Sequence, residues 1–312
     1  MDQADTLRRL MQFHGKKITP APRLRQPVYV FSSGKGGVGK SVCVSHLGAQ
    51  LARQGLRVLL VDGDFGLANL DILLNIQPVA TFEEVVSGQA SMKEALIGVE
   101  PNLWLLPSGS GWLEARAWAP DFREKLVGLF EACPWEMDVI LVDSGAGIHE
   151  SVLSLHQHEV NSVVLLTPEP TAFADAYGLI KTLNRVKEIR DFKIVVNQVA
   201  SEAEGEEIFN KFQGVCRKFL EVNLQFFGSI CRDEKVTQAV MKRKILLDLD
   251  MRASAVQGLE RISRRLIGHI GQGQTNEADG RIQFRFKDEP AQSAPWITQG
   301  LPVSDVMRSL LG

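Results

Sequence analysis

The stretch VYVFSSGKGGVGKSVCVSHLGAQL, residues 28–51, decides the fold. An apolar run of strand length leads into the pattern G-x-x-x-x-G-K-S, and a helix-forming stretch follows directly. This order is typical of a phosphate-binding loop, because glycines let successive backbone N–H groups point inward and the helix N-terminus adds positive potential. The predicted nucleotide-binding residues of the loop are Gly34, Lys35, Gly36, Gly37, Val38, Gly39, Lys40, Ser41 and Val42.

Two lysines in this loop predict a ligand of high negative charge. Lys40 is expected to reach the β and γ phosphates of a nucleotide, and the Ser41 hydroxyl is expected to bind magnesium. Lys35 places a second cation inside the loop, and no acidic residue lies near it in the sequence.

Outward from the loop, strands and helices alternate along the chain. Helical stretches such as AFADAYGLIKTLNRVKEI separate runs that are apolar almost throughout, which is typical of strands buried on both faces. The pattern predicts an α/β fold, with a doubly wound, mostly parallel sheet covered by helices on both faces. The predicted strands are VYVFSS, LRVLLVDGD, LWLLPS, MDVILVDS, SVVLLTPEP, FKIVVNQV and LQFFGSIC.

Composition narrows the class of protein. The 312 residues, 45% hydrophobic, suffice for one large α/β domain or two small ones. A formal net charge of -2 argues against a generally basic nucleic-acid binder, and four scattered cysteines argue against a zinc site or a disulfide scaffold. The chain shows neither a signal peptide nor an apolar run of membrane-spanning length, so we expect a cytoplasmic protein whose membrane contact, if any, is peripheral.

Three segments are expected. Residues 1–27 combine a short amphipathic helix with a basic, Pro-rich linker, and residues 28–270 form the nucleotide-binding domain. Residues 271–312 form a polar tail that ends in VSDVMRSLLG, where an amphipathic helix is predicted.

The loop GKGGVGKS resembles the deviant Walker A motif of the MinD/ParA family of P-loop ATPases, and the resemblance runs from about Val28 to Ile267. In that family the lysine at the position of Lys35 contacts the nucleotide of the partner subunit, so ATP holds a sandwich dimer together. The resemblance therefore implies ATP and Mg2+ as ligands, a homodimer with ATP, and slow, partner-regulated hydrolysis in which Lys35 and Lys40 are catalytic.

Two acidic strand ends complete the predicted site. VLLVDGDFGLANLD places Asp62 and Asp64 at the C-terminal end of a strand, where parallel sheets bind ligands, and ILVDSGAGI does the same for Asp143. By resemblance to the family's switch segments, Asp64 is catalytic and activates the attacking water. Asp143, also catalytic, joins Ser41 and Asp64 around magnesium. Asp62 is expected either to mark the strand end or to support the residues that contact the ligand.

The base is predicted to be adenine. The stretch VVNQVA supplies Asn197 but lacks the aspartate of the guanine-specific N-K-x-D pattern. By resemblance, Asn197 hydrogen-bonds the adenine, and the backbone near Arg232 and Asp233 lines the same pocket.

The first residues, DQADTLRR, match D-Q-A-x-x-L-R, which resembles the N-terminal signature of the FlhG group (also called FleN or YlxH) of flagellar number regulators. In that group the segment binds the GTPase FlhF and stimulates its hydrolysis. The resemblance implies this role for Asp2, Gln3, Ala4, Leu7 and Arg8, with Gln3 close to the GTP.

Several outputs remain open at this stage. One alternative is a ParA-like partition ATPase that binds nonspecific DNA, and another is an antagonist of a flagellar transcription activator. The resemblance also allows flagellar C-ring proteins or the inner membrane as partners, and no specific nucleic acid is expected. His156 and His158 lie two apart on a predicted helix and are interpreted as surface residues.

Overall fold

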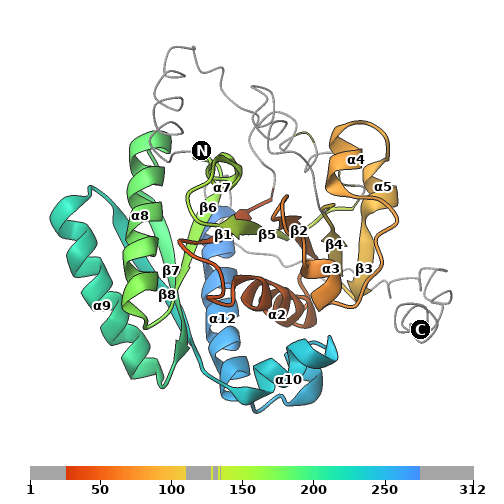
Figure 1. Cartoon of the computed structure of the whole chain (residues 1–312). Helices are drawn as coiled ribbons and strands as arrows, with labels where there is room; N and C mark the ends of the chain where they lie inside the picture. The colour runs from red at the N-terminus through yellow and green to blue at the C-terminus, as the bar shows by residue number, and fades with distance from the viewer. Residues whose placement is uncertain (1–25, 110–127, 129–132, 134, 275–312) are drawn as a thin grey trace, which may run out of the picture. The chain divides into compact units, whose positions relative to one another are not determined.

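A computed structural model describes residues 26–109, 128, 133 and 135–274 of the chain. Its strands form one sheet in the order β3-β4-β2-β5-β1-β6-β7-β8, and every neighbouring pair is parallel except β3 and β4 (Figure 1). The strands are β1 (Val28–Ser33), β2 (Val58–Gly63), β3 (Ile97–Glu100), β4 (Leu103–Leu106), β5 (Val139–Ala146), β6 (Asn161–Leu166), β7 (Asp191–Val199) and β8 (Asn223–Cys231).

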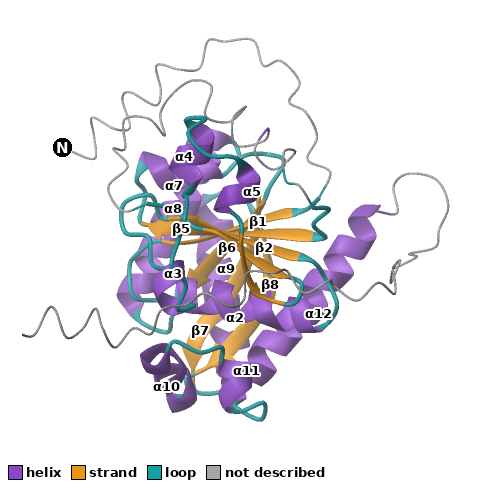
Figure 2. Cartoon of the chain, turned by 90° about the vertical axis from the view of Figure 1, so that its right-hand side faces the viewer, coloured by secondary structure: helices purple, strands orange, loops and turns teal. Residues whose placement is uncertain are grey.

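Helices cover both faces of the sheet (Figure 2). One face packs against α2, α11 and α12, and the other packs against α4 and α5 near β2 and against α7, α8 and α9 near β6 and β7. The described helices are α2 (Lys40–Arg53), α3 (Leu70–Leu73), α4 (Phe82–Val86), α5 (Met92–Ala95), α7 (Glu150–Leu155), α8 (Pro170–Lys187), α9 (Glu202–Phe219), α10 (Glu234–Lys242), α11 (Leu246–Leu249) and α12 (Ser254–Gln274).

The central strand β1 shows why the sheet is buried on both sides. Tyr29 and Phe31 point into the core shared with α2 and α12, while Val28 and Val30 point into the core on the opposite face. Because β5 and β6 flank β1, the C-terminal ends of these three strands lie side by side. The phosphate loop therefore begins at the middle of the sheet.

The predicted α/β class, the parallel sheet and the helices on both faces are confirmed. Strand β3, the antiparallel edge strand, was not predicted, and α12 continues past the predicted domain end at residue 270 to Gln274. The helices predicted near the N-terminus and in the tail lie outside the described residues.

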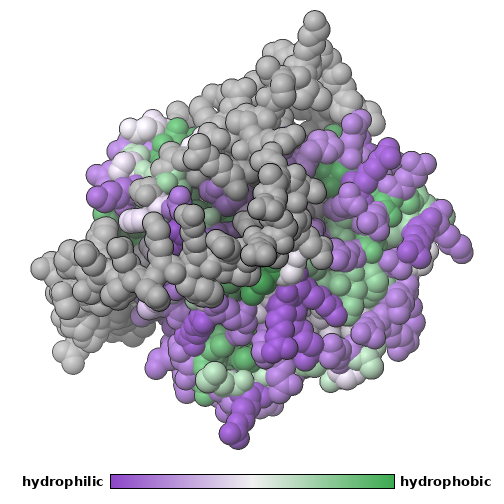
Figure 3. All heavy atoms as spheres, turned by 180° about the vertical axis from the view of Figure 1, so that it is seen from behind, coloured by the Kyte–Doolittle hydropathy of each residue, from purple (hydrophilic) through white to green (hydrophobic). Residues whose placement is uncertain are grey.

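The surface of the described residues is mostly hydrophilic on the face shown in Figure 3, with apolar side chains in small groups. No described helix combines the length and the apolar character that crossing a membrane would require.

All four cysteines are free thiols. Cys43 on α2 and Cys216 on α9 are buried, and burial raises the pKa of each thiol to about 12. Cys133 and Cys231 are partly buried, and burial raises the pKa of these thiols as well.

Candidate nucleotide-binding site

The phosphate loop is held between α8 and β7, and two of its glycines show how closely. A Cβ atom on Gly34 would lie 2.1 Å from the backbone carbonyl carbon of Asp175 on α8, so no side chain fits there. Gly39 has a φ of 86°, and a Cβ there would lie 2.5 Å from the amide nitrogen of Asn197 on β7. The glycine pattern therefore fixes the path of the loop.

The loop ends at the N-terminus of α2, which opens into a cleft of about 410 Å³. Gly39 is the N-cap residue of this helix, and no side chain caps its first turn, so the backbone N–H groups are available to phosphate oxygens. The cleft brings residues of the loop together with Asp64 and Ala146, whereas Lys35, Asp143 and Asn197 are not part of its lining. Its lining is Ser33, Gly36, Gly37, Val38, Gly39, Lys40, Ser41, Val42, Asp64, Asn69, Ile72, Leu73, Ala146, Val240 and Arg243.

Beneath the cleft, Lys40 and Asp143 form a buried ion pair. The Lys40 ammonium donates to Oδ1 of Asp143 at 2.6 Å, and the side chain of Asp143 is fully buried. Burial raises the pKa of Asp143, while the neighbouring ammonium of Lys40 opposes the shift. The structure thus joins the loop lysine to the acidic end of β5, although they are far apart in sequence.

The residues around Asp143 fit a magnesium ion. Its second carboxylate oxygen, Oδ2, is buried and has no hydrogen-bond partner among the described residues. The Ser41 side chain lies close enough to lower the pKa of Asp143. A carboxylate and a hydroxyl are oxygen ligands of the kind that Mg2+ prefers.

Asp62, near the end of β2, and Asp64, just after it, have different surroundings. Asp62 is buried and accepts hydrogen bonds from the backbone N–H groups of Asp64, Asn69 and Leu70 at 3.0 to 3.1 Å. Burial raises the pKa of Asp62 to about 7, although these amides oppose the shift. Asp64 lines the cleft, and its carboxylate accepts from the N–H of Leu67 at 3.2 Å. Asp62 therefore holds the loop that presents Asp64.

Lys35 is held at the start of α8. Its ammonium pairs with the carboxylate of Glu169 and also donates to the Thr171 hydroxyl at 3.1 Å. The Lys35 side chain is 28% exposed, and the ion pair lowers the pKa of Glu169. Sequence analysis missed Glu169, although Pro170, at the first position of α8, marks a helix start there.

Asn197 supports the phosphate loop from behind. Its amide nitrogen donates to the carbonyl oxygen of Val38 at 2.7 Å, and its amide oxygen accepts from the N–H of Gln198. The contact with adenine stays a prediction. Arg232 and Asp233 are not among the cleft-lining residues, and α10 contributes Val240 and Arg243 instead, which sequence analysis did not identify.

The interpretation of His156 as a surface residue is wrong, whereas His158 is exposed as expected. Helix α7 ends at Leu155, so His156 follows the helix rather than lying on it. Its ring nitrogens hydrogen-bond the hydroxyls of Ser32 and Ser162, which explains why the imidazole is buried.

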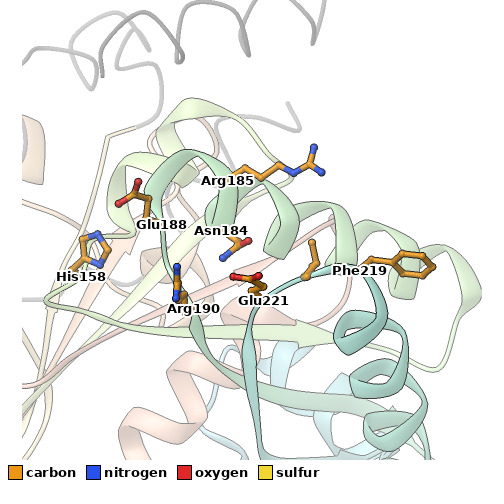
Figure 4. Close-up of a pocket in the computed structure, with 8 residues that line it drawn as sticks. His158, Asn184, Arg185, Glu188, Arg190, Phe219 and Glu221 are labelled. Carbon is orange, nitrogen blue, oxygen red and sulfur yellow. The ribbon is translucent and has the colours of Figure 1, made fainter. Parts of the chain in front are cut away.

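A second hollow, of about 620 Å³, lies where α8 and α9 lead into the next strands. Figure 4 shows that its charged side chains come from the end of α8 and from the turns before β7 and β8. It contains none of the predicted nucleotide-site residues. Its lining is His158, Asn184, Arg185, Glu188, Arg190, Phe219, Leu220 and Glu221. The five residues predicted to activate a partner GTPase lie outside the described residues; they are Asp2, Gln3, Ala4, Leu7 and Arg8.

Comparisons with known proteins agree with this geometry. The family model of the CobQ/CobB/MinD/ParA nucleotide binding domain matches residues 29–262. The antiactivator FleN of Pseudomonas aeruginosa is 34% identical over 239 residues, which cover 77% of this chain and 85% of FleN. The flagellum site-determining protein YlxH of Helicobacter pylori is 27% identical over 278 residues, or 87% and 92% of the two chains. MinD of Pyrococcus horikoshii, solved as a complex with Mg-ADP, shares the fold with a TM-score of 0.63 and 19% identity, covering 78% of this chain and 98% of that one.

Proposed function

Because the chain belongs to the CobQ/CobB/MinD/ParA nucleotide-binding family and is an ATPase related to the flagellar regulators FleN and YlxH, we propose that it is an ATP-dependent switch that controls flagellar number and assembly. ATP binding forms a homodimer, and slow hydrolysis returns the protein to the monomer. The flagellar role is supported by the similarity to FleN and YlxH over most of the chain.

The observation that carries this proposal is the different placement of the two loop lysines. Lys40 is buried against Asp143. We propose that it serves the nucleotide of its own subunit. Lys35 lies at the exposed side of the loop, where its ammonium contacts Glu169 and Thr171. A side chain in that position is free to turn outward, and we propose that it contacts the nucleotide phosphates of a second copy, in the manner of a cation supplied in trans.

Hydrolysis is assigned to the residues around the cleft. Ser41 and Asp143 would hold magnesium, which when bound neutralises charge on the phosphates. Asp64 lines the cleft, and we propose that its carboxylate orients the attacking water. Asp62 keeps the Asp64 loop in place through three backbone amides. Asn197 maintains the loop and is proposed to contact the adenine.

Two substitutions test the dimer and the hydrolysis separately. Lys35→Ala is expected to abolish ATP-dependent dimer formation, because the cation that bridges the subunits is lost. Asp64→Ala is expected to keep the dimer and to slow hydrolysis by about a hundredfold or more, as loss of a proton-transfer group does. Gel filtration with ADP or ATP, together with phosphate release, measures both effects. Mutants that elute and turn over like the wild type would contradict these assignments.

The partner is proposed to be the GTPase FlhF, contacted by the N-terminal residues Asp2 to Arg8. A glutamine both donates and accepts hydrogen bonds, so Gln3 is suited to orient the water that attacks GTP. We expect a synthetic peptide of residues 1–20 to stimulate GTP hydrolysis by FlhF, and Gln3→Ala to remove the stimulation. A peptide with Arg9→Ala, outside the signature, is the matched control. The absence of stimulation by the peptide and by the full chain would refute this partnership.

A second output, antagonism of a flagellar transcription activator, is favoured by one observation. The relative with 34% identity is itself an antiactivator. We propose that the ATP-bound dimer is the form that binds such an activator, or flagellar C-ring proteins, and that it acts in the cytoplasm or peripherally on the inner membrane. Binding of an activator only in the presence of ATP, and its loss in Lys35→Ala, is the expected result in a pull-down with purified proteins.

A further inference from the structure

A buried chain of hydrogen bonds crosses three neighbouring strands just below the phosphate loop. Ser144 on β5 contacts Ser32 on β1 at 2.6 Å between hydroxyl oxygens, and Nε2 of His156 lies 2.7 Å from the Ser32 hydroxyl. Nδ1 of His156 lies 2.8 Å from the hydroxyl of Ser162 on β6. We call these four residues the clasp. None of them is more than 1% exposed.

The number of protons available fixes which group donates in each hydrogen bond of the clasp. The Ser144 hydroxyl donates its single proton to the carbonyl oxygen of Gly145 at 2.8 Å, so it must accept from Ser32. Ser32 has then used its proton and must accept from Nε2–H of His156. Nδ1 is left as the acceptor for Ser162, and the imidazole is neutral. Burial lowers the pKa of His156 to about 3, in agreement with a neutral ring.

The clasp closes the base of the loop and helix that follow Asp143. Ser144 comes immediately after Asp143, and His156 is the residue directly after α7. Both contact Ser32, so the two ends of the segment 145–155 are held at the same serine. At this base, Gly145 lies beside Asp64: a Cβ atom on Gly145 would be 3.4 Å from Oδ1 of the aspartate. The position of this segment therefore affects two residues assigned to hydrolysis.

We propose that His156 is a positioning residue for ATP hydrolysis, which ties the segment after Asp143 to the strand that carries the phosphate loop through Ser32 and Ser144. The inference rests on the hydrolytic cycle described under Proposed function. The imidazole touches neither the cleft nor the ion pair of Lys40 and Asp143. Its effect passes through the Gly145 carbonyl and is expected in turnover rather than in nucleotide affinity.

Three substitutions of His156 separate positioning from simple packing. His156→Phe keeps a ring of similar volume and loses every hydrogen bond. His156→Gln places an amide nitrogen as many bonds from the backbone as Nε2, so it can still donate to Ser32. His156→Asn reaches only as far as Nδ1, so it keeps the contact with Ser162 and loses Ser32.

The matched control is His46→Phe. His46 on α2 is a second buried histidine, and neither ring nitrogen has a hydrogen-bond partner among the described residues. The same substitution there removes a buried imidazole without breaking a hydrogen bond. It reports what the change of ring alone does to the protein.

The experiment measures steady-state ATP hydrolysis and hydrogen–deuterium exchange in the full chain. We expect His156→Phe and His156→Asn to lower kcat about tenfold or more, since misplacing reacting groups by about 1 Å costs up to about a hundredfold. The KM for ATP should change less than about twofold, because the loop amides and Lys40 are untouched. Amides of residues 145–155 should exchange faster in these two variants, while His156→Gln recovers most of the loss and His46→Phe leaves kcat unchanged.

Two results would overturn the proposal. One is a His156→Phe variant with wild-type kcat and wild-type exchange across residues 145–155. The other is an equal loss in all three His156 variants that follows the loss of folded protein, since this would indicate a packing role. A wild-type chain that fails to hydrolyse ATP would contradict the proposed cycle instead, and the exchange measurement would still decide whether His156 holds the segment.

Discussion

At the scale of single residues, surroundings rather than residue type decide what each charged group does. Asp62 and Asp64 are two residues apart. The carboxylate of Asp62 is buried and accepts hydrogen bonds from three backbone N–H groups, whereas Asp64 lines the cleft. The two loop lysines differ in the same way: Lys35 is partly exposed at the edge of the loop, and Lys40 is buried. A buried charged group needs its partners, because a buried charge without them is unfavourable. An exposed ion pair is weak, so its members can exchange partners.

The pair of Lys35 and Glu169 leads to a prediction about dimer formation. If Lys35 must leave Glu169 to reach a second subunit, Glu169→Gln should favour the ATP-bound dimer. Because exposed ion pairs contribute little, the dimer constant is expected to rise by a factor of about two to five at low salt, and less at high salt. Sedimentation velocity at limiting ATP measures this change. A dimer that is unchanged or weaker in Glu169→Gln would show that the ion pair does not compete with association.

At the scale of elements, one carboxylate connects two helices beside the cleft. Asp233 is the N-cap residue of α10, and its Oδ1 accepts from the N–H of Lys235 at 2.9 Å. Its Oδ2 accepts from the hydroxyl of Ser254 and the N–H of Ala255 at the start of α12. Since α10 also supplies Val240 and Arg243 to the cleft, this cap links the nucleotide site to the long helix α12.

Loss of this cap should weaken both helices. Asp233→Ala is expected to lower the free energy of unfolding by about 1 to 2 kcal/mol, the usual cost of removing an N-cap side chain. Asp233→Asn keeps an amide oxygen as acceptor and should cost less. Urea unfolding followed by circular dichroism measures both variants. Equal stability of Asp233→Ala and the wild type would mean that water replaces the cap.

At the scale of the whole molecule, two histidines make stability depend on pH. Burial lowers the pKa of His46 to about 4 and that of His156 to about 3, from an ordinary value of 6.5. At a pH between the lowered pKa of each histidine and 6.5, the unfolded chain binds a proton on that histidine and the folded chain does not. Each histidine therefore contributes stability that is present above about pH 6.5 and is lost as the pH falls, at about 1.4 kcal/mol per pH unit.

The substitution His46→Phe isolates one of these contributions. Buried carboxylates such as Asp62 titrate in the same range, but they do so equally in both proteins and cancel in the difference. Relative to wild type, the variant should gain about 3 kcal/mol in the free energy of unfolding between pH 7.5 and pH 4. Urea unfolding at a series of pH values tests this. A difference that does not change with pH would show that His46 titrates normally in the folded protein.

The sequence predicted those features of the molecule that depend on one short stretch of the chain. The phosphate loop, the two acidic strand ends and seven strands each occupy a short stretch with its own periodicity or spacing. Strand β3 escaped because four residues at an edge, one of them a glycine, carry too little alternation to be recognised. Glu169 and the clasp escaped because their partners are more than a hundred residues away, apart from Ser162, and only the parallel sheet brings them together. His156 was misread because the end of α7 could not be located from the sequence.

The burial of the cysteines has a practical consequence for following the switch in solution. With a pKa of about 12, the thiols of Cys43 and Cys216 are ionised at pH 7 in about one molecule in a hundred thousand, so they react slowly with alkylating reagents. The partly buried Cys133 and Cys231 are also poorer nucleophiles than an ordinary thiol. A fluorescent maleimide should therefore label a cysteine introduced at the exposed Met241, beside the cleft, in preference to the four native thiols. A Met241→Cys variant can in this way carry an optical reporter of nucleotide exchange without removal of the native cysteines.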